Sequence, residues 1–191
     1  MKLPLRFQIT EFDCGTTSLQ NALCYLYERE DIPAELIKII SDYTLDCYDE
    51  NGNPGEGGTS VKAMELIVHK LTDYCTKNKF NLNCYHLKND KVKLNNIKKC
   101  LTQNGCVIIR TYLKVPHYVL ITSIDEKYIY IWDPYFLDKN FFIADSQVKL
   151  ITNENYQYNR KVTKKRINSY LKKDYSLGPL NTRECIFFNK N

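Results

Sequence analysis

The amino-acid sequence predicts one α+β domain of 191 residues, in which helices come first and strands follow. Apolar residues recur at helical spacing in several segments before residue 105, whereas β-branched and aromatic residues dominate the runs between residues 106 and 134. A chain of this length buries a hydrophobic core without needing metals or disulfides. We therefore expect residues 1–191 to form one domain, with a helical half at about 1–105 and a sheet half at about 106–191.

Three segments of the first half have the period of an amphipathic helix. One begins at Cys14 and repeats apolar residues on one face through Leu26. The second covers residues 31–43, with Pro33 in its first turn. The third covers residues 61–75 and follows a turn-rich connector, "DENGNPGEGGTS", whose last residues, Thr59 or Ser60, can cap it.

The remaining segments alternate between strands and short helices. Residues 80–88 alternate like a strand, and residues 93–105 form a short helix closed by Gly105 at a C-cap position. Three strands are expected at 106–113, 117–124 and 128–132. Beyond Pro134 the pattern weakens: the basic run at 160–173 indicates a helix or loop, and "RECIFF" a last strand.

Composition and charge narrow the class of protein. Hydrophobic residues make up 43% of the chain and the net charge is +5, which is typical of a globular protein. The N-terminus lacks the apolar stretch of a signal peptide and no segment has the length of a membrane span, so we expect a cytoplasmic protein without a membrane partner. No nucleic-acid-binding module is recognisable. The eight cysteines are scattered without a CxxC pair, so we expect neither a metal site nor a cofactor.

Cys14 differs from the other seven cysteines by its position. It opens a helix after a turn, where the positive end of the helix dipole favours a thiolate, and Gly15 next to it allows close approach of the backbone. Most of the others lie within helical or strand patterns, as small buried residues do. Cys14 is therefore the candidate nucleophile.

His117 is the candidate base, because it stands where a predicted strand emerges from a loop. His69 and His86 lie within regular elements and are expected to be structural or surface residues. Asp133 ends the strand that follows the one starting at His117. If the two strands form a hairpin around residues 125–127, His117 and Asp133 fall roughly opposite one another, and Asp133 can orient the imidazole.

Gln8, six residues before Cys14, completes the candidate site. Its side-chain amide can donate a hydrogen bond to a developing oxyanion, together with the backbone N–H of Cys14. In hydrolases such a donor stabilises the transition state by roughly 2.7–4 kcal/mol.

Four stretches in this order resemble the double-glycine leader peptidases, a branch of the papain-like cysteine peptidases. They are "QITEFDCG" from Gln8, "GTS" from Gly58, "HYVL" from His117 and "WDP" from Trp132. The resemblance implies a papain-like fold, with Cys14 as nucleophile, His117 as general base and acid, Asp133 as its orienting residue and Gln8 as oxyanion donor. The chain departs from the family in its polar "TTS" after Gly15 and in lacking the membrane domain of transporter-fused members.

These residues predict an acyl-Cys14 intermediate but leave its acceptor open. Papain-like folds also include acyltransferases and amide ligases of natural-product assembly, among them ligases that build polythioamides from carrier-bound chains. Because the basic run suits an acidic carrier protein, the expectation leans slightly towards transfer of the acyl group from a carrier thioester to an amine. The alternative is a cysteine peptidase that processes a peptide or leader sequence. A non-catalytic binding module is a third class, against which the complete set of four residues argues.

Overall fold

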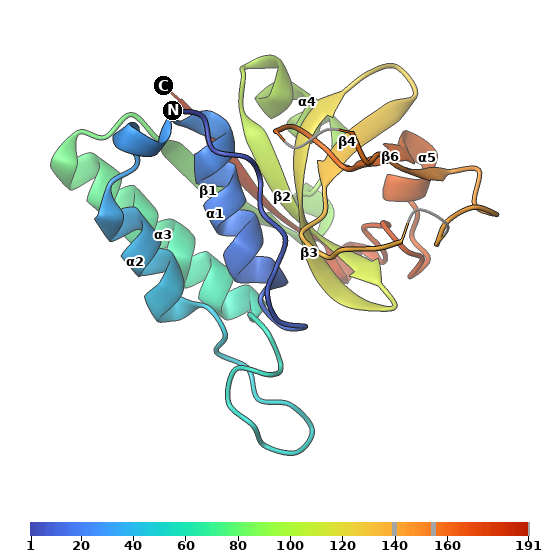
Figure 1. The fold of residues 1–191 in the computed structure, drawn as a ribbon, viewed down its shortest axis with the longest axis horizontal. Coiled ribbons are helices and arrows are strands. Elements are labelled where there is room, and N and C mark those ends of the chain that lie inside the picture. The colour runs from blue at the N-terminus through green and yellow to red at the C-terminus, as the bar shows by residue number, and fades with distance from the viewer. Residues whose placement is uncertain (139–140, 154–155, 191) are drawn as a thin grey trace.

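The computed structural model describes residues 1–138, 141–153 and 156–190. Helices α1 (Cys14–Leu26), α2 (Ala34–Tyr43) and α3 (Val61–Asn78) form a layer against one face of a seven-stranded sheet (Figure 1). The short helices α4 (Leu94–Thr102) and α5 (Lys164–Ile167) contact the sheet as part of a second core: α4 contacts β2, β3 and β7, and α5 contacts β4 and β6. The predicted α+β class, with the helix of Cys14 packed on an antiparallel sheet, is confirmed.

The strand order in the sheet is β1-β7-β2-β3-β4-β6-β5, and every neighbouring pair is antiparallel. The strands are β1 (Asn83–Lys88), β2 (Cys106–Leu113), β3 (Val115–Ile124), β4 (Tyr128–Trp132), β5 (Val148–Leu150), β6 (Arg160–Thr163) and β7 (Glu184–Asn189). The last strand of the chain, β7, lies between β1 and β2. The C-terminal segment therefore completes the middle of the sheet.

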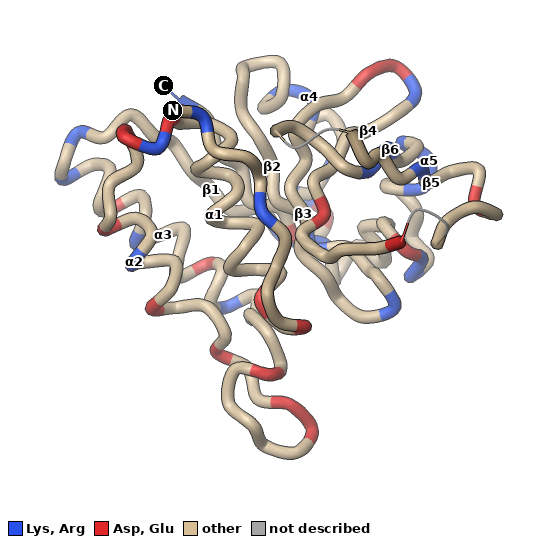
Figure 2. Tube along the Cα trace, viewed as in Figure 1, with Lys and Arg blue, Asp and Glu red and all other residues tan. Residues whose placement is uncertain are grey.

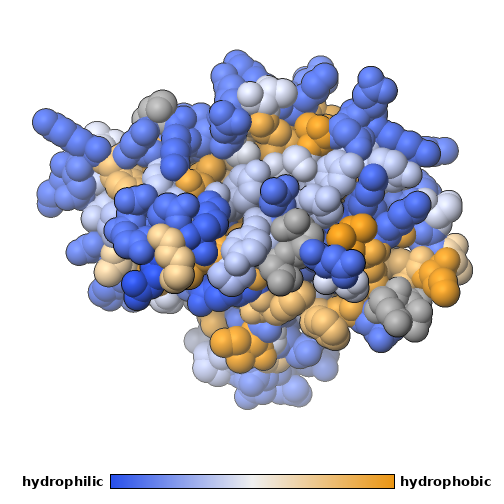
Figure 3. All heavy atoms as spheres, turned by 45° about the horizontal axis from the view of Figure 1, so that its top comes forward, coloured by the Kyte–Doolittle hydropathy of each residue, from blue (hydrophilic) through white to orange (hydrophobic). Residues whose placement is uncertain are grey.

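The sheet separates two hydrophobic cores. On the side of α1, α2 and α3, buried Leu19 and Leu23 pack with Met64 and the sheet residue Leu120. On the other side the core contains residues of α4 and of the segment after β4, namely Ile97, Cys100, Phe142, Val148, Ile167 and Tyr175. The helical period of residues 14–26 thus predicts the buried face of α1 correctly. On the face of the molecule in Figure 3, hydrophilic residues predominate and hydrophobic residues form separate small groups.

Two local expectations change in the structure. Residues 160–163 form strand β6, not a helix or loop, because Arg160 and Val162 alternate inwards with the partly exposed Lys161 and Thr163. Helix α4 ends at Thr102 with Gln103 as its C-cap, so Gly105 is not the capping residue. A Cβ on Gly105 would lie 2.6 Å from the carbonyl oxygen of Phe188 in β7, so this glycine is required by close packing against a strand.

No helix among the described residues is long and apolar enough to cross a membrane.

Candidate active site

Cys14 is the first residue of α1, and the loop before it is organised by Asp13, the N-cap residue. The Asp13 carboxylate accepts hydrogen bonds from the backbone N–H of Ile9 (3.2 Å) and Thr10 (2.8 Å) and from the Thr10 hydroxyl (2.7 Å). Partial burial alone would raise the pKa of Asp13, but these donors hold it below its usual value. The loop that presents Cys14 is therefore fixed by an ionised side chain immediately before the thiol.

Gly15 has a role that the sequence did not predict. A Cβ at this position would lie 2.8 Å from Met64 Cε and 3.0 Å from Thr59. The glycine is buried and allows α1 to pack closely on the start of α3, so it also serves packing between helices.

His117 lies near the start of β3 with its side chain buried. Its Nε2 is 2.7 Å from Oδ1 of Asp133, and its ring also interacts with the Cys14 side chain, which contributes to the raised pKa of His117. Burial alone would lower the pKa of His117, but the Asp133 carboxylate and Cys14 raise it to about 10. The imidazole is therefore held in its protonated form at neutral pH, between a thiol and a carboxylate.

The hairpin of β3 and β4 brings His117 and Asp133 together with an offset. Leu120 pairs with Trp132, so the continued register places Asp133 opposite Val119, two residues from His117. The register shift between Ile121 and Ser123 moves Asp133 from a position opposite Leu120 to one opposite Val119, on the same face as His117. His117 and Asp133 are diagonal neighbours on the same face, which is close enough for their side chains to meet.

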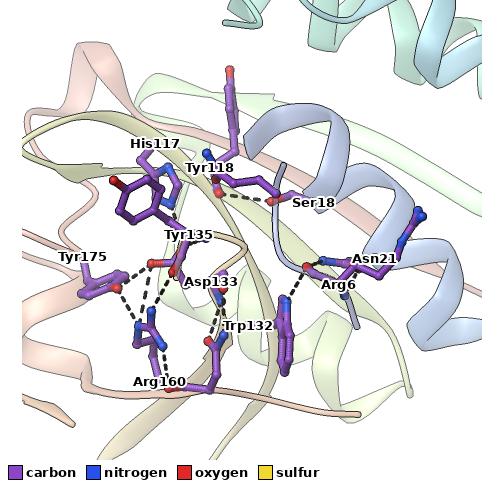
Figure 4. A network of polar contacts seen from close by, with 12 residues as sticks. Arg6, Ser18, Asn21, His117, Tyr118, Trp132, Asp133, Tyr135, Arg160 and Tyr175 are labelled. Carbon is purple, nitrogen blue, oxygen red and sulfur yellow. Dashed lines mark hydrogen bonds and ion pairs between the residues drawn. The ribbon is translucent and has the colours of Figure 1, made fainter. Parts of the chain in front are cut away.

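Asp133 is fully buried and has several further donors, shown in Figure 4. Tyr175 donates its hydroxyl to Oδ2 at 2.5 Å, and the backbone N–H of Tyr135 donates to Oδ1 at 2.8 Å. Arg160 lies behind: its Nε is 3.8 Å from Oδ2 of Asp133 and donates to the Tyr175 hydroxyl at 2.9 Å. Burial alone would raise the pKa of Asp133, but His117, Arg160 and Tyr175 lower it. The carboxylate is therefore ionised although it is buried.

The backbone of Asp133 is held as firmly as its side chain. Asn159 accepts a hydrogen bond from the Asp133 N–H at 2.7 Å and donates its amide to the Asp133 carbonyl at 2.8 Å. Sequence reasoning missed Asn159, Arg160 and Tyr175, because they belong to the segment beyond Pro134 where no motif was recognised. The one available signal was that Arg160 occupies an inward position in an alternating pattern.

Gln8 lies beside this pair, since its backbone N–H donates to the carbonyl of Pro134 at 2.9 Å. Its side-chain Nε2 donates to the carbonyl of Thr10 at 2.7 Å, and its Oε1 is buried without a hydrogen-bond partner among the described residues. The contact with Thr10 uses one of the two N–H bonds of the amide.

A cleft of about 680 Å³ opens at Cys14 between the helical layer and the sheet. One wall is formed by the loop from Cys47 to Ser60 and by Glu11 and Phe12; the other is formed by residues of β2 and β3, namely Arg110, Val115, Pro116 and Tyr118. Ser60 caps α3 by accepting a hydrogen bond from the backbone N–H of Ala63 at 3.0 Å, as predicted.

The other histidines and cysteines have structural surroundings. His69 is exposed and pairs with Asp73 on α3, and His86 Nε2 is 2.8 Å from the buried carboxylate of Glu184. For each of the other seven cysteines, burial is the largest cause of a pKa above the usual value. They are Cys24, Cys47, Cys75, Cys84, Cys100, Cys106 and Cys185. Cys14 alone combines a helix N-terminus with a histidine contact.

The comparisons with known proteins agree with this arrangement. The sequence model described as the Peptidase_C39 like family matches residues 1–172. The chain belongs to this family. The C39-like match extends past Pro134, and so includes Asn159 and Arg160 behind Asp133. None of the curated proteins compared with the chain matches it.

A crystal structure from Bacillus anthracis has a similar fold. The description of that protein as a C39-like peptidase is itself an inference. The TM-score is 0.56 at 14% sequence identity, and the match covers 98% of this chain and 94% of the other. The fold and the family membership confirm the resemblance as far as the papain-like, C39-like branch, and they support a cysteine-nucleophile enzyme of the peptidase type.

Proposed function

We propose that this C39-like protein is a cysteine peptidase that acts through an acyl-Cys14 intermediate. The observation that supports the proposal is the series of contacts from Cys14 to His117 and from His117 to Asp133. Cys14 lies at the N-terminus of α1 and lines an open cleft. A thiol beside a protonated imidazole that is oriented by a buried carboxylate is the arrangement required of an activated cysteine nucleophile. The substrate is a peptide bound in the cleft.

The four residues have distinct parts in the reaction, and His117 acts first as acid and then as base. The Cys14 thiolate attacks the carbonyl carbon of the scissile bond, and the Gln8 amide and the backbone N–H at the start of α1 stabilise the oxyanion. Protonated His117 donates its proton to the leaving amine as the C–N bond breaks, which leaves an acyl-Cys14 thioester. Neutral His117 then takes a proton from a water molecule that attacks the thioester, and the free acid departs as the thiolate–imidazolium pair re-forms. Asp133 keeps the imidazole oriented throughout.

Water is proposed as the acceptor because the family description is that of peptidases. The basic segment at residues 160–173 favoured a carrier protein as partner, but some of its side chains form contacts within the molecule. Arg160 lies behind Asp133, and Arg166 forms an ion pair with Asp145 at 2.7 Å. Lys165, Lys172 and Lys173 remain exposed. Transfer to an amine therefore stays a prediction from sequence that the same experiment tests. All eight cysteines are free, in keeping with the reducing cytoplasm that we propose as its location.

The experiment offers the purified protein a peptide or an acyl thioester in water enriched in oxygen-18, with and without added amines. Intact mass spectrometry of the products is expected to show a free acid with one heavy oxygen, whatever amine is present. A product that partitions to the amide as amine is added would overturn hydrolysis and support the ligase. Full activity in a Cys14→Ala variant would contradict both.

Cys47 provides a matched control, because it lines the same cleft and is also partly exposed. A Cys47→Ala variant is expected to keep its activity, whereas Cys14→Ala is expected to lose it. Iodoacetamide labelling tests the non-catalytic alternative. If Cys14 is alkylated no faster than Cys47, the protein is a binding module that retains the fold.

A further inference from the structure

Arg110 is a charged side chain in the middle of a core strand. In β2 it is flanked by the buried residues Ile109 and Thr111, and it is itself only partly exposed. Its side chain lines the cleft that also contains Cys14 and Tyr118. A guanidinium at such a position costs free energy of desolvation unless an anion pairs with it.

No residue described by the structure forms a hydrogen bond or an ion pair with the Arg110 guanidinium. Glu184 lies opposite Arg110 if the register of β2 and β7 is continued by one pair, and its two carboxylate oxygens contact other side chains. Oε1 is 2.8 Å from His86 Nε2, and Oε2 accepts the Tyr118 hydroxyl at 2.8 Å. The positive charge of Arg110 therefore faces the cleft without a partner from the sheet.

The acidic residues on the opposite wall are also engaged. The Glu11 carboxylate interacts with Tyr135 and raises the pKa of its hydroxyl, and Glu56 accepts a hydrogen bond from the Asn53 amide at 3.2 Å. Asp46 accepts from the backbone N–H and hydroxyl of Ser60. Figure 2 shows the acidic residues of this wall along the loop before α3, apart from the strands. Arg110 lines this cleft together with Tyr118 and Cys47.

We propose that Arg110 forms a subsite for a carboxylate of the substrate, on the acyl side of the bond that Cys14 attacks. The inference rests on the proposed function of Cys14 and adds a specificity to it. A planar guanidinium binds a carboxylate through two parallel hydrogen bonds, and partial burial strengthens the pair. The chemical class recognised is a peptide segment with an Asp or Glu side chain.

The residues that line the cleft indicate which part of the substrate binds there, the acyl part or the leaving amine. The leaving amine must reach the proton of His117, whereas the acyl part stays on Cys14. The cleft is lined by Cys14 and Arg110, and His117 is buried outside its lining. The part of the substrate that occupies this cleft is therefore the acyl part.

The test uses tripeptidyl chloromethyl ketones, which alkylate an activated thiol and contain only acyl-side residues. Probes with one Glu, moved through the three positions in an otherwise alanine peptide, are compared with probes that have Gln at the same position. The measured quantity is kinact/KI for Cys14, located by peptide mapping. At one position the Glu probe is expected to react at least about tenfold faster than the corresponding Gln probe. This factor corresponds to the free energy of one charge-assisted hydrogen-bonded pair that is partly screened by water.

Substitutions at Arg110 identify the source of the preference. Arg110→Met retains the length and apolar stem of the side chain, and should make the Glu and Gln probes equal by lowering the rate of the Glu probe. Arg110→Glu should favour Lys over Glu at the same position. Lys62→Ala is the matched control, because Lys62 is an exposed cation beside the cleft residue Val61 and does not line the cleft.

The outcomes separate the subsite from the proposed function. Equal rates for Glu and Gln at all three positions in the unmodified protein overturn the subsite and leave the thiol enzyme standing. If neither probe modifies Cys14, the proposed function fails and the subsite fails with it. Because the rate ratio in the unmodified protein should also fall as salt is raised, the inference is testable even if an Arg110 variant does not fold.

Discussion

At the scale of single residues, the site is a series of side-chain contacts that leads from the second hydrophobic core to Cys14. Arg160 donates to the Tyr175 hydroxyl, which donates to Asp133, which holds His117 against Cys14. Each hydrogen bond orients the next group, so the thiol depends on residues more than 140 positions away in the chain. This dependence makes Tyr175 a positioning residue, whose effect is separable from its packing.

A Tyr175→Phe variant retains the buried ring and removes one donor from the Asp133 carboxylate. We expect kcat to fall by about tenfold or more, since a hydrogen bond to a charged group is worth roughly 1.5–3 kcal/mol. KM should change little, and the alkaline limit of the pH profile should move to higher pH, because a carboxylate with one donor fewer is more basic and holds the proton of His117 more strongly. Tyr170→Phe, which alters an exposed tyrosine, is the control. A similar fall in that variant would contradict the assignment.

The raised pKa of His117 also predicts how stability depends on pH. The imidazolium is favoured in the folded chain, so its contribution is complete below the ordinary value of 6.5 and is lost as pH rises towards about 10. The unfolding free energy of the protein should therefore exceed that of a His117→Gln variant most at about pH 6, and the difference should shrink between pH 7 and pH 10. Chemical denaturation across this range measures it. A difference that grows with pH would show that His117 is neutral in the fold.

At the scale of elements, the loop between α2 and α3 builds one wall of the cleft. Gly57 donates its N–H to the Cys47 carbonyl at 3.2 Å, and Cys47 donates to the Gly58 carbonyl at 3.1 Å, which closes the base of the loop. A Cβ at Gly57 would overlap the carbonyl oxygen of Tyr48 and lie 2.8 Å from Cys47 Cβ. The glycine is therefore required by the close approach of two segments, independently of any Gly-Gly specificity.

A Gly57→Ala variant should displace this wall. We expect kcat/KM to fall by at least about tenfold while the melting temperature changes by only a few degrees, because the loop lies outside both cores. Gly52→Ala is the control: unlike Gly57, Gly52 has a positive φ, of 85°, but a Cβ there meets nothing within 4 Å. It should strain the tip of the loop without moving the wall. Equal loss of activity in the two variants would argue against a steric cause.

Sequence patterns predict some of these elements better than others. The helix of Cys14 and the strands on both sides of His117 are long and strongly periodic, so their positions and their meeting could be predicted. Strand β6 has only four residues, and the pattern of Arg160 followed by Lys161 is typical of a charged, exposed segment. Arg160 points inwards because it faces the buried carboxylate of Asp133. This contact is between residues of different segments, so no local sequence pattern predicts it.

At the scale of the whole molecule, the order of the strands explains why the tail matters. Strand β7 pairs with both β1 and β2, and buried Phe187 and Phe188 contribute to the two cores. A last strand was predicted from "RECIFF", but its place between β1 and β2 was not, since pairing across about 80 residues of sequence leaves no local signal. Likewise, the sequence predicts four residues of the candidate site but not the network behind Asp133.

Truncation tests this organisation. A chain that ends at Gly178 lacks β7, so it should lose the sheet partner of β1 and the cooperative thermal unfolding transition. Circular dichroism in the near ultraviolet, which reports fixed aromatic packing, should lose most of its signal. A chain that ends at Asn189 retains β7 and should melt like the full chain. If the shorter chain unfolds cooperatively at the same temperature, β7 is not an integral part of the core.

The central claim is that Cys14 becomes acylated during turnover. The direct measurement is acid quenching of a reaction with an acyl thioester or activated peptide ester, followed by peptide mapping by mass spectrometry. We predict the acyl mass on the peptide that contains Cys14, its removal by hydroxylamine as expected for a thioester, and its absence in Cys14→Ala. Turnover without an acyl group on Cys14, or with the acyl group on Cys47, would contradict the account.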